Sequence, residues 1–154
     1  MFTKEEKKEF NIEFWGLFKR QMRRHMSSNG KRINWLKYPT EIKHTYLRLE
    51  TSTDFISVHF DIQIKDSEIR ELFWDQILEL KGIIDSKLGH KSEWIENVEI
   101  EGVFQISRIS WKKEGLSYYN KNQWPEIYDF FKSVLIDFDR FYQEFKDVLI
   151  NLLD

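Results

Sequence analysis

The chain has no cysteine and no alanine, and it has only six glycines and two prolines. The lack of cysteine excludes a disulfide framework and a Cys-based zinc site, and it fits a reducing compartment, so we expect a cytoplasmic protein. No run approaches the roughly 18 consecutive apolar residues of a membrane-spanning helix. The charged start of the sequence, MFTKEEKKEF, lacks the apolar stretch of a signal peptide. We therefore expect no membrane partner.

What is present is typical of a globular domain. The 154 residues are 41% hydrophobic and 32% charged, with a formal net charge of −2. This balance predicts one folded domain over residues 1–154 rather than a disordered chain. Because alanine is missing while phenylalanine occurs 13 times, bulky side chains must fill the core, and we expect tight packing around aromatic rings.

Three segments show the spacing of helices. Thr3 and Glu6 match a capping box and predict a first helix from about Lys4 to Met26, which the stretch SSNG ends. A second helix is predicted from Asp66 or Ser67 to Gly89. Its apolar stripe is Ile69, Leu72, Phe73, Ile77, Leu80 and Ile84.

The last helix is predicted from Pro125 to about Leu152. Its apolar residues cover an arc of about 160°, which is wider than the roughly 100° that a surface helix needs. We therefore expect this helix to contact two surfaces, the sheet and the first helix, or else a partner in a homodimer.

Four segments are predicted as strands, at residues 46–50, 56–65, 92–100 and 103–113. In the second, Ile56, Val58, Phe60, Ile62 and Ile64 alternate with Ser57, His59, Asp61, Gln63 and Lys65. This alternation predicts one buried face and one solvated face. The element order α-β-β-α-β-β-α predicts an α+β domain, a two-layer α/β sandwich whose antiparallel sheet has helices packed on one face.

The polar face of the second strand resembles the metal-binding strand of a nuclease. Such a strand presents an Asp, then a carboxylate two residues before a Lys, to hold Mg²⁺ and position a water. Here Gln63 replaces the second carboxylate, so one alternative is a magnesium-dependent nuclease that uses Glu50, Asp61 and Lys65. The competing interpretation is a solvated sheet face with weak charge pairs.

Other catalytic and cofactor motifs are missing. The sequence has no His-x-x-x-His pair, no helical Glu-x-x-His pair, no Gly-rich phosphate loop and no Gly-x-Ser-x-Gly elbow. We therefore expect no metal, no cofactor and no catalytic residue, and a protein that is not an enzyme.

Positive charge gathers in one stretch. Residues 19–44 contain eight Lys and Arg against Glu41 alone, a net of +7, whereas residues 1–18 carry −1 and residues 45–154 carry −8. Cations neutralise phosphates, and aromatic rings stack on unpaired bases. The predicted binding residues are Lys19, Arg20, Arg23, Arg24, Lys31, Arg32 and Trp35. Their partner would be nucleic acid or an acidic protein. A third interpretation is that Arg23 and Arg24 complement a helix end while the others decorate a loop.

Several stretches together resemble a known family. They are SVHFDIQI, ELFWDQILELKGIIDSKLG, Glu93-Trp94, SRIS, QWPEIYDFFKSVLIDFDRF and the N-terminal FWGLF. In this order they resemble the bacterial and archaeal family named domain of unknown function, DUF4268. The resemblance implies a DNA-related or defence setting, because members often follow a half that looks like a restriction endonuclease. This chain is expected to act as a standalone copy. The family has no activity to transfer, so it assigns no functional residue.

These observations favour a non-catalytic binding or accessory domain that acts with nucleic-acid-processing or defence proteins. The first alternative is the magnesium-dependent nuclease described above. The second is a scaffold that self-associates, as a homodimer, through the aromatic faces of its terminal helices.

Overall fold

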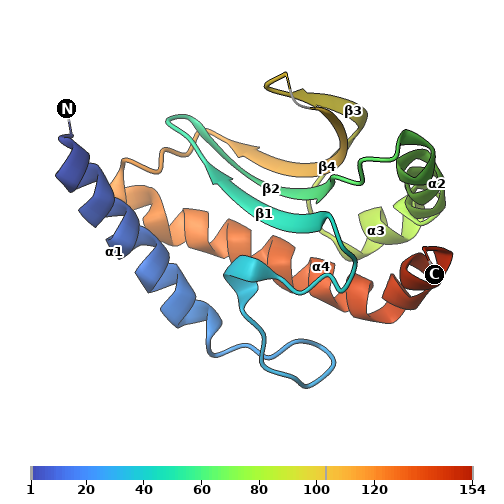
Figure 1. Cartoon of the computed structure of the whole chain (residues 1–154). Coiled ribbons are helices and arrows are strands. Elements are labelled where there is room, and N and C mark those ends of the chain that lie inside the picture. The colour runs from blue at the N-terminus through green and yellow to red at the C-terminus, as the bar shows by residue number, and fades with distance from the viewer. Residues whose placement is uncertain (1, 103, 154) are drawn as a thin grey trace.

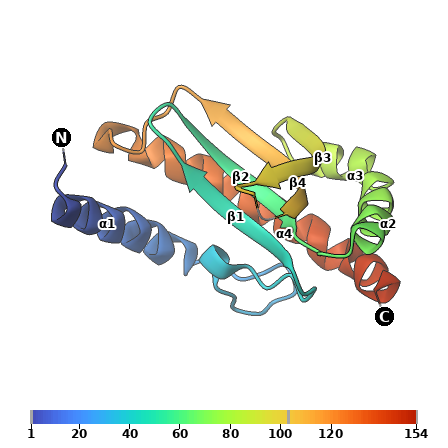
Figure 2. The ribbon, with the colours of Figure 1, turned by 45° about the horizontal axis from the view of Figure 1, so that its top comes forward.

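A computed structural model describes residues 2–102 and 104–153. In chain order, the elements are α1 (Lys4–Met22), a 3₁₀ helix η1 (Trp35–Lys37), β1 (Thr45–Thr51), β2 (Phe55–Ile62), α2 (Ser67–Leu78), α3 (Lys81–Lys87), β3 (Ser92–Ile100), β4 (Phe104–Glu114), a second 3₁₀ helix η2 (Lys121–Gln123) and α4 (Trp124–Leu152). The long helix α4 lies along one face of the sheet (Figure 1). In both views α1 lies beside the first half of α4, while α2 and α3 lie near its second half (Figure 2).

The four strands form one antiparallel sheet with the order β1-β2-β4-β3. Two hairpins therefore meet where β2 pairs with β4. Glu101 and Gly102 form a turn after β3 and both have positive φ, 24° and 68°. The predicted α+β class with an antiparallel sheet is confirmed.

The N-terminal helix begins as predicted but ends earlier. The Thr3 Oγ1 accepts a hydrogen bond from the Glu6 amide (3.1 Å), and the Glu6 carboxylate accepts one from the Thr3 amide (3.2 Å), which is a complete capping box. The helix ends at Met22 rather than near Met26. The reason lies downstream, because the Arg32 guanidinium donates to the carbonyl oxygen of Arg23 (2.8 Å) and so caps the helix there.

The predicted second helix is wrong as one element, because the chain breaks at Glu79 and Leu80 into α2 and α3. The predicted stripe is also partly wrong, since Ile69 and Leu72 are 42% and 51% exposed. The break lets both short helices pack against α4. The predicted residues Phe73 and Ile77 are buried as expected. The buried face of α2 also includes Trp74, whose ring meets the ring of Trp94 on β3 at 5.4 Å between centroids.

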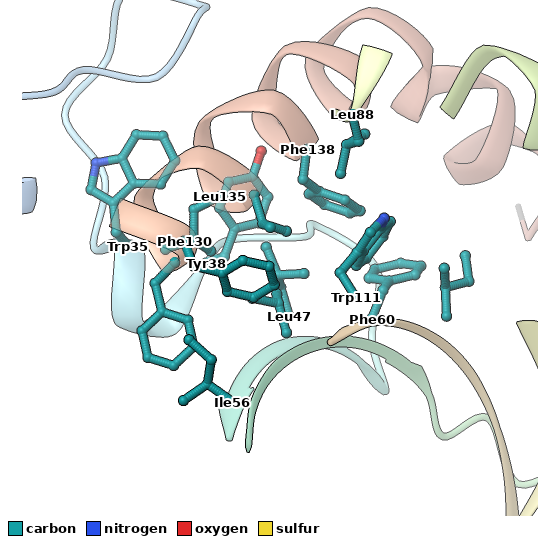
Figure 3. Packing of buried hydrophobic residues seen from close by; sticks show 14 of the residues in the cluster. Trp35, Tyr38, Leu47, Ile56, Phe60, Leu88, Trp111, Phe130, Leu135 and Phe138 are labelled. Atoms are coloured by element: carbon teal, nitrogen blue, oxygen red, sulfur yellow. The ribbon is translucent and has the colours of Figure 1, made fainter. Parts of the chain in front are cut away.

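The wide apolar arc of α4 contacts both surfaces expected of it. Phe138 packs on Phe60 of β2 and Trp111 of β4, with ring centroids 5.3 and 6.0 Å apart (Figure 3). About three turns earlier in the same helix, Tyr128 packs against Phe14 of α1, with ring centroids 5.0 Å apart. The arc is thus covered within the chain, and a homodimer is not needed to explain it. None of the described helices combines the length and apolarity that crossing a bilayer requires.

Candidate functional site

The basic segment, defined as residues 19–44, runs from the last turn of α1 through η1 to the start of β1. Its cations are Lys19, Arg20, Arg23, Arg24, Lys31, Arg32, Lys37 and Lys43, and all eight are exposed. In Figure 1 the loop that follows α1 forms the lower edge of the molecule, and η1 lies next to β1. The charge excess of the sequence is therefore exposed along one segment of the chain.

None of these eight cations forms an ion pair with a carboxylate in residues 2–102 or 104–153. Elsewhere in the described chain, half of the Lys and Arg side chains pair with carboxylates, as Lys121 does with Glu13 at 2.8 Å. The one acidic residue of the basic segment, Glu41, pairs with Lys146 on α4 instead. The positive charge of the basic segment is therefore not neutralised by ion pairs with the described residues.

A buried carboxylate on α4 anchors the basic segment. Asp139 is 1% exposed. It accepts hydrogen bonds from the Ser27 hydroxyl (2.8 Å), the Ser28 amide (2.7 Å) and the Tyr38 hydroxyl (2.6 Å). Burial, together with the bond to Asp139, raises the pKa of Tyr38 well above its usual value, so this hydroxyl stays a donor. The stretch from Ser27 to Tyr38, which carries Lys31, Arg32 and Lys37, is thus fixed to α4 at both of its ends.

Trp35 lies in this loop but does not offer its ring to a ligand as the sequence suggested. It is 3% exposed, and its indole N–H donates to the carbonyl oxygen of His25 at 2.9 Å. Tyr38, the other aromatic residue of the segment, is 6% exposed. The stacking role predicted for Trp35 is therefore wrong in this structure, because the core needs the ring.

The structure brings four of the seven predicted binding residues together. Lys19, Arg23, Arg32 and the buried Trp35 line a hollow of about 290 Å³ beside the end of α1, and Asn34 lines it with them. Arg20, Arg24 and Lys31 are exposed but do not line this hollow. The cluster forms because Lys19 and Arg23 are one helical turn apart and the loop returns Arg32 to the helix end.

A second hollow, of about 490 Å³, lies on the outer face of the sheet, opposite α4. The β3–β4 hairpin bends back over this face (Figure 1). The lining comes from all four strands and includes Glu50, His59, Glu93, Arg108 and Lys112. Charges of both signs therefore line this hollow, in contrast to the first.

The predicted solvated face of β2 is wrong in one respect, because its polar residues are buried. Ser57, His59 and Asp61 are 0%, 8% and 1% exposed. β2 is a central strand, so side chains from β1 and β4 cover its outer face. Burial without partners would be costly, and most of these groups are hydrogen-bonded within the sheet.

Glu50, Ser57 and His59 form a small cluster on this face. The Nε2 of His59 lies 2.8 Å from the Glu50 carboxylate and 3.0 Å from the Ser57 hydroxyl. Partial burial opposes ionisation of Glu50, but the hydrogen bonds from His59 and Ser57 outweigh it and hold the pKa of Glu50 below its usual value. A Ser-His-acid triad uses both ring nitrogens, whereas here both contacts fall on Nε2. The Nδ1 of His59 has no partner in the described chain.

The nuclease residues are not assembled as a metal site. Asp61 is bound by two nitrogens of Arg108, at 2.7 and 3.0 Å, so both of its carboxylate oxygens already have a partner. Lys65 lies beyond the end of β2, exposed. Across the described residues, no group of three or more His, Cys, Asp or Glu is placed to hold a metal ion. We therefore assign no magnesium chemistry to Glu50, Asp61 and Lys65.

Two structurally important residues were missed by sequence reasoning. Asp139 had a partial signal, because it lies between Phe138 and Phe141 in the apolar stretch of α4, but Asp137 on the other side of Phe138 gives a similar signal. Arg108 had none, because its pairing with Asp61 depends on the register between β2 and β4, which no local pattern reveals.

Comparison with known proteins gives a family but no activity. Neither the curated proteins nor the solved structures contain a match to this chain. The model of one family, described as a domain of unknown function (DUF4268), matches residues 10–146. The matched range begins at Phe10 in α1 and ends at Lys146 in α4, so it includes the sheet, both hollows and the anchored basic segment. Because that match covers most of the sequence, the chain belongs to the DUF4268 family.

Proposed function

We propose that this chain is a non-catalytic binding domain that holds duplex nucleic acid by its phosphate backbone, through the basic segment. One observation carries the proposal. All eight cations of the segment are exposed, and none has a carboxylate partner in the described chain. Concentrated, unneutralised Lys and Arg attract a polyanion and release its counterions on binding.

The make-up of the surface favours nucleic acid over an acidic protein. Protein interfaces depend on a few aromatic or apolar anchors that become buried in the complex. Met26 is the sole large hydrophobic side chain of the basic segment that is exposed, at 50%. The segment therefore offers charge and hydrogen-bond donors with little apolar surface, which suits phosphates better than a protein partner.

The burial of the aromatic rings favours a duplex over a single strand. Proteins that bind single strands without sequence preference stack unpaired bases on exposed aromatic side chains. Trp35 and Tyr38 are 3% and 6% exposed and are held by hydrogen bonds inside the domain. With no ring to offer, the segment is suited to backbone contacts, which carry no sequence information.

The proposal is tested by fluorescence anisotropy of a labelled DNA duplex and of its separated single strand, at about 50 and 200 mM salt. We expect duplex affinity to fall roughly 100-fold between these salts, as about four phosphate contacts would require. We also expect Arg23→Glu/Arg24→Glu to abolish binding. The matched control is Lys7→Glu/Lys8→Glu, which makes the same charge change at exposed positions on the same helix.

Four results would overturn all or part of the proposal. The first is an absence of duplex binding at the lower salt. The second is equal weakening by both charge-reversed pairs, which would indicate an effect of net charge rather than a site. The third is binding of poly-glutamate but not of the duplex, which would identify an acidic protein as the partner. The fourth is preference for the single strand, which would support nucleic acid as the partner but contradict the proposed preference for a duplex.

A further inference from the structure

The hollow at the end of α1 has the chemistry of a seat for one phosphate group. Its polar lining is Lys19, Arg23, Arg32 and Asn34, and within the described residues no carboxylate lines it. A hollow with three cations and no acidic side chain has a strongly positive potential. The cations are also in one place rather than scattered along the surface. An anion is the ligand that this arrangement favours.

The donors of this hollow are partly oriented in advance. The Arg32 guanidinium is fixed by its bond from Nη1 to the Arg23 carbonyl oxygen (2.8 Å), which leaves its other two nitrogens to donate. The Asn34 carbonyl oxygen accepts from the Leu36 amide at 3.1 Å, so the side-chain NH₂ of Asn34 remains a donor. The side-chain ammonium of Lys19 makes no hydrogen bond or ion pair with any described residue.

The floor of the hollow keeps this geometry in place. Met22 and Trp35 line it from below and are 1% and 3% exposed, so they belong to the core. The indole of Trp35 is further fixed by its bond to His25. A site built on packed, hydrogen-bonded residues loses less entropy on binding than one built on a mobile loop.

The end of α1 would by itself repel an anion, because carbonyl oxygens collect there. In this structure the Arg32 guanidinium covers the carbonyl of Arg23, and Lys19 and Arg20 stand in the last turn. Together these cations reverse the sign of the field at the helix end. One guanidinium, that of Arg32, is enough to cap the Arg23 carbonyl. The lysine and arginine beside it are therefore more than the helix end requires.

We infer that Lys19, Arg23, Arg32 and Asn34 form a phosphate seat that fixes the position of the domain on its nucleic acid. This inference rests on the proposed function and extends it, because it assigns one phosphate to one place within the basic segment. The phosphate comes either from the backbone diester or from a terminal monoester of the strand. Phosphate contacts of this kind set register and orientation.

The test compares two pairs of neutralising substitutions in duplex binding. Lys19→Gln/Arg23→Gln removes two charges from the seat. Lys37→Gln/Lys43→Gln removes two from exposed positions elsewhere in the basic segment. We expect the seat pair to weaken duplex binding at least about 10-fold more than the control pair, since a placed contact exceeds a general field. A comparison of duplexes with a 5′-phosphate and with a 5′-hydroxyl distinguishes the two sources of the phosphate. The affinities of these duplexes differ only if the seat binds the terminal monoester rather than the backbone diester.

A second measurement does not depend on duplex binding. Inorganic phosphate is titrated into the full chain at constant ionic strength, with chloride as the control, and the side-chain NH₂ signal of Asn34 is followed by NMR. We expect that signal to shift with phosphate in the native chain and not in the Lys19→Gln/Arg23→Gln variant.

The outcomes separate the two proposals. Equal weakening by both pairs, with no shift at Asn34, overturns the seat while the nucleic-acid function stands. A shift at Asn34 in a chain that binds no duplex supports the seat and overturns the proposed function. Circular dichroism confirms that each variant is folded.

Discussion

On the outer face of the sheet, Asp61 binds Arg108 and Glu50 binds His59, whereas the eight cations of the basic segment have no carboxylate partner in the described chain. Both surfaces are rich in charge, but their physical roles differ. Asp61 is buried and Glu50 is half exposed. A buried charge is tolerated only when it is paired, so the fold depends on the partner that Arg108 provides for Asp61. Exposed cations need no internal partner, so those of the segment remain available to a ligand. The following predictions test this contrast, starting with the largest effect.

Asp61→Ala should be the most damaging change. It leaves the Arg108 guanidinium, whose side chain is 22% exposed, without its partner. We expect the free energy of unfolding to fall by about 3–5 kcal/mol, the usual consequence of breaking a buried ion pair. Urea denaturation measures it. The double variant Asp61→Leu/Arg108→Met should recover most of the loss, because no charge is left unpaired. A loss below about 1 kcal/mol in the single variant would contradict a structural role for this pair.

Asp139→Ala should come next, because it connects the fold to the basic segment. Removal of this carboxylate leaves the Ser28 amide and the Tyr38 hydroxyl without their acceptor. We expect a loss of about 2–3 kcal/mol and faster hydrogen exchange at the Ser28 amide, while the amides of α4 keep their protection. Asp129→Ala, at an exposed position of the same helix, serves as the control. Unchanged exchange at Ser28 would contradict the anchoring role.

Glu50 should contribute a smaller, pH-dependent effect. Its pKa in the folded protein lies below the ordinary value of 4.5. Its contribution to stability is therefore complete above that value and is lost as the pH falls through the lower, folded value. We expect the native chain to lose more stability than Glu50→Gln between about pH 6 and pH 3, measured by urea denaturation at each pH. Equal pH profiles for the two chains would show that the His59 and Ser57 contacts do not favour the carboxylate.

Neutralising the basic segment should affect stability least. Lys37 and Lys43 are exposed and have no described ion-pair partner. For Lys37→Gln/Lys43→Gln we expect the free energy of unfolding to change by less than about 0.5 kcal/mol, with any gain arising from reduced repulsion. A thermal melt at low salt measures the change. A loss above about 1 kcal/mol would show that these cations serve the fold itself.

Local sequence patterns predicted individual helices and strands well, but they predicted poorly which residues of different elements contact one another. Alternation identified β2, and the wide arc of α4 predicted contacts with both the sheet and α1, because each pattern follows from the geometry of one element. The burial of Asp61 was not predictable, because it depends on Arg108, which is 47 residues away. Asp61 lies on the face of β2 that carries polar residues, and such a pattern predicts a face exposed to solvent.

The candidate site was also predictable only in part. The composition of residues 19–44 showed the charge excess, and in the structure these cations are exposed. The sequence did not predict that Lys19, Arg23 and Arg32 come together, because this depends on how a loop without periodicity returns to the helix. Trp35 was misjudged for a related reason. An aromatic residue among cations in the sequence suggests a ring that stacks on bases, but only the fold shows whether that ring is buried in the core.

The position of α4 in the chain has a consequence for synthesis. This helix covers the apolar face of the sheet and also receives Phe14 of α1, yet it follows every other element in sequence. At about 5–20 residues per second, its 29 residues take roughly 1–6 s to be made. Until α4 has been made, Phe60 of β2 and Trp111 of β4 lack the Phe138 ring that covers them in the folded domain. The apolar face of the sheet is therefore uncovered during this time, and exposed apolar surface of this kind makes a partly folded chain prone to aggregation.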